Sequence, residues 1–160
     1  MTEKKIKKLY DLRKTVESLK KNGQKIVFTN GCFDVLHKGH IKLLKKAKSF
    51  GDILVVAINS DSSVKKIKGN KRPISRARDR AIVLSAIEAV DYVTTFDEPD
   101  PARVIMKLNP DVLVKGGDWD KKEIVGSEYV KSKGGKVYSV PLSKGCSTTS
   151  IINRIIKSTG

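Results

Sequence analysis

Short apolar runs alternate along the chain with longer segments in which apolar positions recur every three or four residues. The runs are rich in Val and Ile and predict strands, whereas the recurring spacing predicts amphipathic helices. Strands are predicted at residues 25–30, 52–58, 91–96, 111–115 and 136–140. Helices are predicted at residues 6–22, 39–50, 76–89, 101–108, 121–133 and 147–157, and a polar, lysine-rich loop is predicted at residues 59–74.

This alternation of strands and helices indicates the fold class. Strands that alternate with helices at such a pitch form a parallel sheet with helices on both faces. We therefore expect an α/β fold, a Rossmann-like doubly wound parallel sheet of about five strands. One domain is expected over residues 1–160, with residues 1–23 as an N-terminal helix that leads into the core. Ligands of such folds bind beyond the carboxyl ends of the strands, so the informative residues should follow Asn30, Ile58, Lys115 and Val140.

Length and composition narrow the class of protein. The 160 residues are 39% hydrophobic and 31% charged, as in ordinary globular domains. No apolar run approaches the roughly 18–20 residues of a membrane-spanning helix, and no secretory signal follows the basic start. Two cysteines, Cys32 and Cys146, are too few for a disulfide framework or a four-cysteine zinc site. We therefore expect a cytoplasmic protein without a membrane partner, in which both thiols are reduced packing residues.

The net charge adds a preference for anionic ligands. Lys and Arg total 33 against 17 Asp and Glu, a formal charge of +16, which attracts nucleic acid, anionic lipid or phosphorylated substrates. Binders of single-stranded nucleic acid interleave aromatic and basic residues, whereas this chain is only 6% aromatic. We expect no nucleic-acid partner, although a non-catalytic basic nucleotide-binding or nucleic-acid-binding module stays an alternative. A localised phosphate site must be identified from a motif.

The segment after the first predicted strand carries such a motif. Both histidines of the chain, His37 and His40, lie here at the predicted start of a helix. Gly31 and Gly39 permit close approach of the backbone to a ligand, and the helix N-terminus favours an anion. Simpler interpretations are a helix cap or a zinc-binding pair. Metal-binding histidine pairs more often have a spacing of four and no third ligand is evident, so no protein metal site is expected.

The pattern Gly31-x-Phe33-Asp34-x-x-His37-x-Gly39-His40 resembles the signature of the HxGH nucleotidyltransferase superfamily. That group includes glycerol-3-phosphate cytidylyltransferase, pantetheine-phosphate adenylyltransferase and, more distantly, class I aminoacyl-tRNA synthetases. The resemblance implies catalytic roles for His37 and His40. It further implies that the nucleotide is bound by the residues around them, namely Asn30, Gly31, Cys32, Phe33, Asp34 and Gly39.

A second segment places hydroxyl groups at the start of the last predicted helix. Ser147 is a good N-cap residue, and a capped helix without further function is the simpler interpretation. In the superfamily, however, a Gly-x-Ser-Thr-Thr segment opposes the histidines and holds the phosphates of the nucleotide. The resemblance therefore implies nucleotide binding by Ser147, Thr148 and Thr149, because two opposed helix N-termini can hold a triphosphate.

The lysine-rich segment after the second strand supplies cations. Lysines on a flexible loop can fold over a triphosphate as point charges, although a solvated basic loop is the alternative. The resemblance implies a catalytic role for Lys65 and substrate binding by Lys68 and Arg80. It also implies that Asp61 orders a metal-bound water or the hydroxyls of a sugar.

The segment after the fourth strand, Lys115-Gly116-Gly117-Asp118-Trp119, is similar to a narrower group, the heptose 1-phosphate adenylyltransferases. The likeness runs from about residue 12 to residue 156, through the segments 30–34, 72–73, 88–91, 125–126, 134–135 and 145–149. It implies transfer of AMP from ATP to D-glycero-D-manno-heptose 1-phosphate, with Mg²⁺ carried by the nucleotide. Lys115, Gly116, Gly117 and Asp118 would bind the nucleotide, and Trp119 would stack on a ring or pack at the loop edge.

Two further expectations come from this narrower group. Its bifunctional members carry a sugar kinase on the same polypeptide, and 160 residues leave no room for one. A separate upstream sugar kinase is therefore expected, together with a homodimer. A cytidylyltransferase acting on glycerol 3-phosphate or another phosphorylated alcohol stays the main alternative. Against it, such relatives have an arginine shortly before the Ser-Thr-Thr segment, where this chain has only Lys144.

Overall fold

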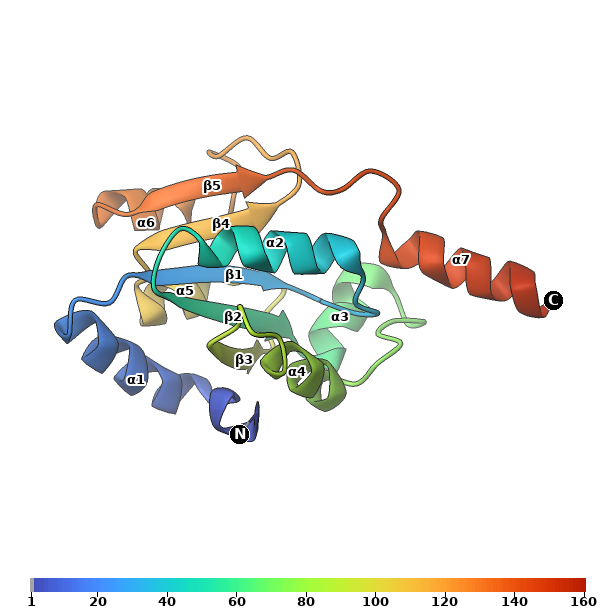
Figure 1. The fold of residues 1–160 in the computed structure, drawn as a ribbon, viewed down its shortest axis with the longest axis horizontal. Coiled ribbons are helices and arrows are strands. Elements are labelled where there is room, and N and C mark those ends of the chain that lie inside the picture. Colours follow the sequence, from blue (N-terminus) through green and yellow to red (C-terminus); the bar gives the residue numbers. More distant parts are fainter. Residues whose placement is uncertain (1) are drawn as a thin grey trace.

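The computed structural model describes residues 2–160 and contains one five-stranded sheet in the order β3-β2-β1-β4-β5, with parallel pairing throughout (Figure 1). The strands are β1 (Ile26–Gly31), β2 (Ile53–Asn59), β3 (Tyr92–Phe96), β4 (Val112–Gly116) and β5 (Lys136–Val140). This arrangement confirms the doubly wound α/β fold. The chain steps outward from β1 in one direction to β2 and β3, and in the other direction to β4 and β5, so β1 and β4 border the topological switch point.

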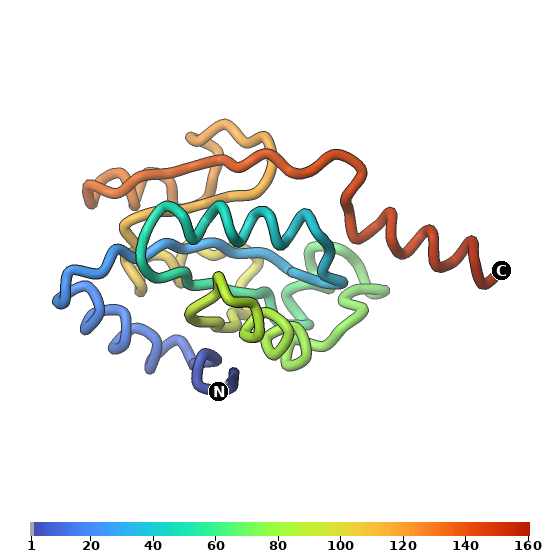
Figure 2. The backbone as a smooth tube through the Cα atoms, in the orientation of Figure 1, coloured from blue at the N-terminus to red at the C-terminus, as the bar shows by residue number. Residues whose placement is uncertain are grey.

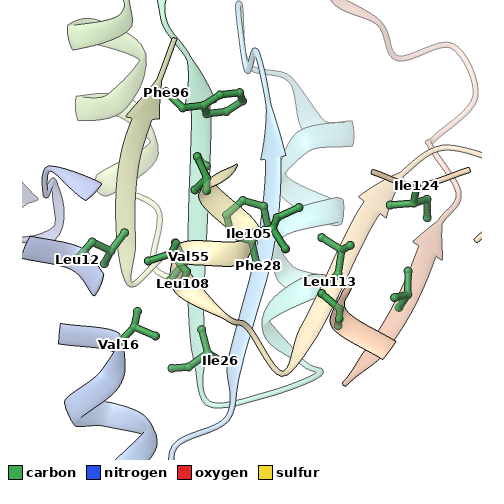
Figure 3. Close-up of a cluster of buried hydrophobic side chains, with 14 residues drawn as sticks. Leu12, Val16, Ile26, Phe28, Val55, Phe96, Ile105, Leu108, Leu113 and Ile124 are labelled. Atoms are coloured by element: carbon green, nitrogen blue, oxygen red, sulfur yellow. The ribbon is translucent and has the colours of Figure 1, made fainter. Parts of the chain in front are cut away.

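Helices cover both faces of the sheet and enclose two apolar clusters. One cluster packs under α1 (Leu9–Lys21), α5 (Ala102–Leu108) and α6 (Ser127–Ser132), as Figure 3 shows for Leu12, Phe28 and Ile105. The other packs under α2 (Lys38–Lys48) and α4 (Ala77–Ser85). Because side chains of a strand alternate between faces, Val27 joins the α2 cluster while Phe28 joins the other, and both are fully buried.

Three helical segments differ from the sequence prediction. The predicted loop at 59–74 contains α3 (Asp61–Lys68), which begins where the Oγ of Ser60 accepts a hydrogen bond from the N–H of Ser63 at 3.2 Å. The predicted helix at 121–133 is shortened to α6, because Gly126 has a φ of +86° immediately before it. The first helix, predicted at 6–22, begins only at Leu9 as α1, because Ile6 forms a parallel bridge to Val93 of β3, and a short 3₁₀ turn, η1 (Thr2–Lys5), precedes that bridge.

The last helix, α7 (Thr148–Thr159), projects away from the sheet (Figures 1 and 2). None of its residues is buried. Four isoleucines, Ile151, Ile152, Ile155 and Ile156, follow one another at helical spacing, and the last two are 54% and 62% exposed. Across residues 2–160, no helix is both long enough and apolar enough to cross a bilayer.

Candidate active site

The two histidines form a reciprocal cap at the start of α2. Nδ1 of His37 accepts a hydrogen bond from the N–H of Gly39 at 3.1 Å, and Nδ1 of His40 accepts one from the N–H of His37 at 3.2 Å. The two rings lie 4.0 Å apart between centroids. A neutral imidazole carries one proton on one of its two nitrogens. Because Nδ1 accepts a hydrogen bond in both histidines, that proton is on Nε2. The cap therefore leaves each histidine with its Nε2–H as a donor for a ligand.

The electrostatic surroundings keep His40 neutral at physiological pH. Burial lowers the pKa of His40 to about 4, and the nearby His37 and Lys68 add to the lowering. Burial also lowers the pKa of His37. A neutral His40 preserves the capping hydrogen bond, since protonation of its Nδ1 would abolish the acceptor.

This lowered pKa predicts a pH dependence of stability. Unfolded His40 titrates near 6.5 and folded His40 near 4, so the unfolded state binds more protons between these values. The contribution of His40 to the free energy of unfolding is complete above pH 6.5 and is lost as the pH falls to 4. An asparagine can accept the same cap through Oδ1 without titrating. Urea unfolding from pH 7.5 to 4 should therefore show a flatter profile for His40→Asn than for the wild type, and equal slopes would contradict the prediction.

The structure brings the hydroxyl-bearing start of α7 against the histidine segment. The Oγ1 of Thr148 donates to the carbonyl of Asp34 at 2.7 Å, and Ser147 caps α7 by accepting from the N–H of Ser150 at 3.0 Å. A Cβ placed on Gly39 would lie 2.9 Å from Cε1 of His37 and 3.3 Å from the Cβ of Cys146. Glycine at position 39 thus permits the close approach of Cys146 to the start of α2, whereas the predicted approach of this backbone to a ligand stays a prediction.

The loop that carries the histidines is held in a strained conformation. Phe33 and Val35 have φ values of +47° and +52°, which are unfavourable for side chains with a Cβ, and above all for a β-branched residue. The buried carboxylate of Asp34 holds the loop, because it accepts hydrogen bonds from the N–H groups of Ile74 and Ser75 at 2.7 and 2.9 Å. Such strain is found mainly where surrounding contacts fix a functional geometry. Nucleotide binding by Phe33 and Asp34, which are both buried, stays a prediction.

A pocket of about 490 Å³ opens beyond the carboxyl ends of β1, β2 and β4. Its polar lining comes from the strand ends and α3, and its apolar walls come from loops that precede α5 and α6. The lining residues that matter here are Asn30, Cys32, Asn59, Lys68, Lys115, Trp119, Pro99, Pro101, Ile124 and Val125. The pocket volume lies in the range of small-molecule sites, and its position at the switch point is the expected one.

Two lysines face this pocket without a counter-ion. Burial lowers the pKa of Lys115, an effect that Cys32 opposes and to which the charge of Lys68 adds. Lys68 also contributes to the lowered pKa of His40. Within residues 2–160, neither lysine forms a salt bridge. The charge of Lys68 thus acts on both His40 and Lys115, and a bound anion would relieve the repulsion between the two ammonium groups.

The loop after β4 is fastened to the neighbouring strand. The N–H of Gly117 donates to the carbonyl of Val140 at 2.8 Å, and Ser139 bonds both Gly117 and the N–H of Trp119. The indole Nε1–H of Trp119 donates to the carbonyl of Gly116 at 3.0 Å, while 47% of the residue stays exposed beside the pocket. This arrangement presents a flat aromatic face to a ligand. Asp118 is exposed on the same loop, and its nucleotide contact stays a prediction.

Arg80 and Asp61 bond to each other within the fold. The guanidinium of Arg80, whose side chain is 1% exposed, donates to the carbonyls of Cys32, Asn59 and Ser75 at 2.6, 2.8 and 2.9 Å. It also donates to Oδ1 of Asp61 at 2.9 Å, and that same oxygen accepts from the N–H of Ala77. These contacts give both residues a structural task. Four of the five N–H donors of Arg80 are engaged in this way, and the predicted substrate contacts of Arg80 and Asp61 stay predictions.

Lys65 and two residues that sequence reasoning did not single out complete the description. Lys65 is exposed on α3, about one turn before Lys68, and its catalytic role stays a prediction. Asn59 is buried at the end of β2, bonds to Ser63 and lines the pocket. Its place at a strand end was the available signal. Arg72 lies beside Asp34 and Thr149, and the sequence places it only within the segment 72–73 of the resemblance, without a role.

Comparisons with known proteins agree with this geometry. The chain is 50% identical over 159 residues to the bifunctional protein HldE of Geobacter metallireducens, covering 99% of this chain and 32% of that protein. The chain thus spans about a third of the length of the curated relatives that it matches. The solved lipopolysaccharide core biosynthesis protein of Thermoplasma volcanium is 32% identical, with a TM-score of 0.63 over 78% of this chain and 100% of its own.

A more distant likeness supports the fold alone. The solved pantoate-beta-alanine ligase of Francisella tularensis is 20% identical, with a TM-score of 0.61 over 95% of this chain and 77% of its own. Residues 28–154, which span the sheet from β1 to the first turns of α7, match the cytidylyltransferase-like family. This range includes both histidines, both pocket lysines and the Ser-Thr-Thr segment. The chain therefore belongs to the cytidylyltransferase-like family of nucleotidyltransferases.

Proposed function

We propose that this chain transfers AMP from ATP to D-glycero-D-manno-heptose 1-phosphate, giving ADP-heptose and pyrophosphate. The observation that carries the proposal is the juxtaposition of two helix starts, one with paired imidazole donors and one with hydroxyls, beside a pocket that holds two lysines without counter-ions. Such an arrangement suits a polyphosphate bound next to a second phosphorylated substrate. The similarity to HldE proteins supports the step in ADP-heptose synthesis.

The proposed chemistry is a direct in-line displacement. An oxygen of the sugar 1-phosphate forms a bond to the α-phosphorus, and the bond to the bridging oxygen breaks as its electron pair leaves with pyrophosphate. The attacking oxygen is already anionic, so no strong general base is required. The energetic obstacle is the approach of two anions and the charge that develops on the transferred and leaving groups, and both are met by positioning and electrostatic stabilisation.

The residues of the site divide this work between them. The Nε2–H groups of His37 and His40 would donate to oxygens of the α- and β-phosphates, which their neutral, Nδ1-bonded state allows. The start of α7 would hold the pyrophosphate half with the hydroxyls of Ser147 and Thr149 and the backbone N–H of Thr148, whose own hydroxyl is bonded to Asp34. Lys68 and Lys115 would offset the charge of the two phosphates as they meet.

Mg²⁺ would enter with the nucleotide. The carboxylates nearest to the two helix starts are engaged in the fold, Asp34 with two backbone N–H groups and Asp61 with Arg80 and Ala77. Among residues 2–160, no cluster of three or more His, Cys, Asp or Glu side chains is placed to hold a metal. This donor set fits a Mg²⁺ that the phosphates and water coordinate, where it would neutralise the charge of the leaving group.

The remaining parts of the proposal concern the surroundings of the reaction. The nucleoside would occupy the pocket beside Trp119, and the sugar phosphate would approach the α-phosphate from the lysine side. A kinase outside these 160 residues would supply the sugar 1-phosphate. The two free thiols, Cys32 and Cys146, are typical of a reducing compartment, which supports a cytoplasmic location.

A substrate panel tests the proposed function. Each of ATP, CTP, GTP and UTP is combined with heptose 1-phosphate, glycerol 3-phosphate or no acceptor, and pyrophosphate release is measured. We expect release only with ATP and heptose 1-phosphate together, and we expect ADP-heptose in the product by mass spectrometry. Release with CTP and glycerol 3-phosphate would instead favour the cytidylyltransferase, and no release with any pair would overturn the transferase.

A further inference from the structure

Arg72 differs from the other buried arginine of the site in how few hydrogen bonds it makes. It lies in the loop between α3 and α4 and contacts Thr149 at the start of α7, and its side chain is only 16% exposed. Its Nη1 is buried and has no hydrogen-bond partner. Its Nη2 makes a single long contact of 3.4 Å to the Oγ1 of Thr149. Arg80, by contrast, donates to four acceptors.

The only carboxylate beside Arg72 among residues 2–160 is already occupied. Oδ2 of Asp34 lies 3.7 Å from Nη1, beyond hydrogen-bond distance, and accepts from the N–H of Ile74 at 2.7 Å. The other oxygen, Oδ1, accepts from the N–H of Ser75. Asp34 therefore keeps the guanidinium near the loop but does not satisfy its donors. A buried cation with unused donors is costly unless an anion joins it.

The position of Arg72 indicates which anion that is. Thr149 belongs to the first turn of α7, and the preceding Thr148 is bonded to the carbonyl of Asp34. Nη2 of Arg72 and Oγ1 of Thr149 therefore converge at the helix start that faces the histidine segment. A planar guanidinium beside a hydroxyl and a helix N-terminus is a favourable site for a phosphate group.

We propose that Arg72, together with Thr149, binds the pyrophosphate half of the nucleotide. This inference rests on the proposed nucleotidyl transfer and adds to it a residue that the sequence motifs do not assign. Arg72 would then hold the leaving group from the α7 side, whereas His37 and His40 would donate to the α- and β-phosphates. Arg72 would thus bind substrate from the loop after α3, while Arg80 holds the surrounding backbone together.

Binding measurements with separate parts of the nucleotide test this inference. Isothermal titration calorimetry compares wild type, Arg72→Gln and the control Arg76→Gln, which alters an exposed arginine four residues away. Three probes are used: ATP with Mg²⁺, inorganic pyrophosphate with Mg²⁺, and AMP. We expect Arg72→Gln to weaken ATP and pyrophosphate binding by about tenfold or more, the loss of one charge-assisted contact, and to leave AMP binding unchanged. Arg76→Gln should match the wild type for all three probes.

The outcomes separate this inference from the proposed function. If the wild type binds ATP and pyrophosphate and Arg72→Gln binds both equally well, the role of Arg72 is overturned and the proposed function is not. Absence of triphosphate binding by the wild type overturns both. Equal weakening of ATP and AMP would also contradict a contact to the pyrophosphate half. Should Arg72→Gln not fold, as circular dichroism would show, Thr149→Val removes the other half of the contact and should give the same selective loss.

Discussion

Replacing His40 by asparagine is expected to leave the fold intact and to lower turnover by at least about 10²-fold. Asparagine can keep the cap, because its Oδ1 can accept from the N–H of His37 as Nδ1 does now. It has no group at the position of Nε2, so the donor for the phosphate is lost. The loss falls on turnover because this donor stabilises charge that develops as the leaving group departs. Pyrophosphate release under saturating substrates measures it.

Two further variants at this position sharpen the test. Glutamine places an amide N–H₂ near the former Nε2 but forfeits the cap, so His40→Gln should retain more turnover than His40→Asn and should be less stable. His40→Ala loses both groups and should be as inactive as asparagine. If the asparagine variant turned over at a near-normal rate, the Nε2 donor would have no part in the chemistry. The opposite ranking of glutamine and asparagine would show that the cap matters more than the donor.

Replacing Arg80 by methionine is expected to lower the free energy of unfolding by about 3 kcal/mol, the lower end of the range for breaking a buried ion pair, because Asp61 is partly exposed. Methionine fills much of the volume but leaves three carbonyls and the carboxylate of Asp61 without their donor. Arg80→Lys should also destabilise, since an ammonium cannot reproduce the planar set of donors. Urea unfolding monitored by circular dichroism measures both changes.

The control for this prediction lies on the same helix. Arg78 is exposed on α4, and its replacement by methionine should change stability by less than about 0.5 kcal/mol. An Arg80→Met protein as stable as the wild type, but with a raised KM for the sugar phosphate, would return Arg80 to the substrate site. The two outcomes can be told apart, because a loss of stability is measured without substrate, whereas a raised KM is measured only with substrate.

The sheet could be predicted from sequence because its central strands are buried on both faces. From Leu54 to Asn59 every residue of β2 is buried, and such a strand must be a continuous apolar run. The short helix α3 was missed because Val64 is its only buried apolar residue and most of its other residues are polar or charged. The serine that caps it was present in the sequence, but a single cap is a weak signal without an apolar stripe.

The position of the site was predictable for a topological reason. Parallel strands have their carboxyl ends at the same edge of the sheet, so the segments after β1 and β4 had to meet there. The positions of the histidines and of the pocket lysines follow from this rule. The hydrogen bonds that hold Arg80 in the fold were not predictable. The acceptors that hold Arg80 are backbone carbonyls of Cys32, Asn59 and Ser75, from three separate segments. Nothing in the sequence tells one carbonyl from another.

The last helix has a consequence for how the chain responds to its ligands. None of its residues is buried, and its side-chain hydrogen bonds to the body come from Thr148 and Thr149. A twelve-residue helix that buries none of its residues is only marginally stable in water, so a polyphosphate bound between α2 and α7, as proposed, would also stabilise α7. Linkage between two binding sites is reciprocal. If the bound nucleotide raises the affinity of α7 for a molecule that covers Ile155 and Ile156, that molecule raises the affinity for the nucleotide by the same factor. A remote surface can thereby set the affinity of the catalytic cleft.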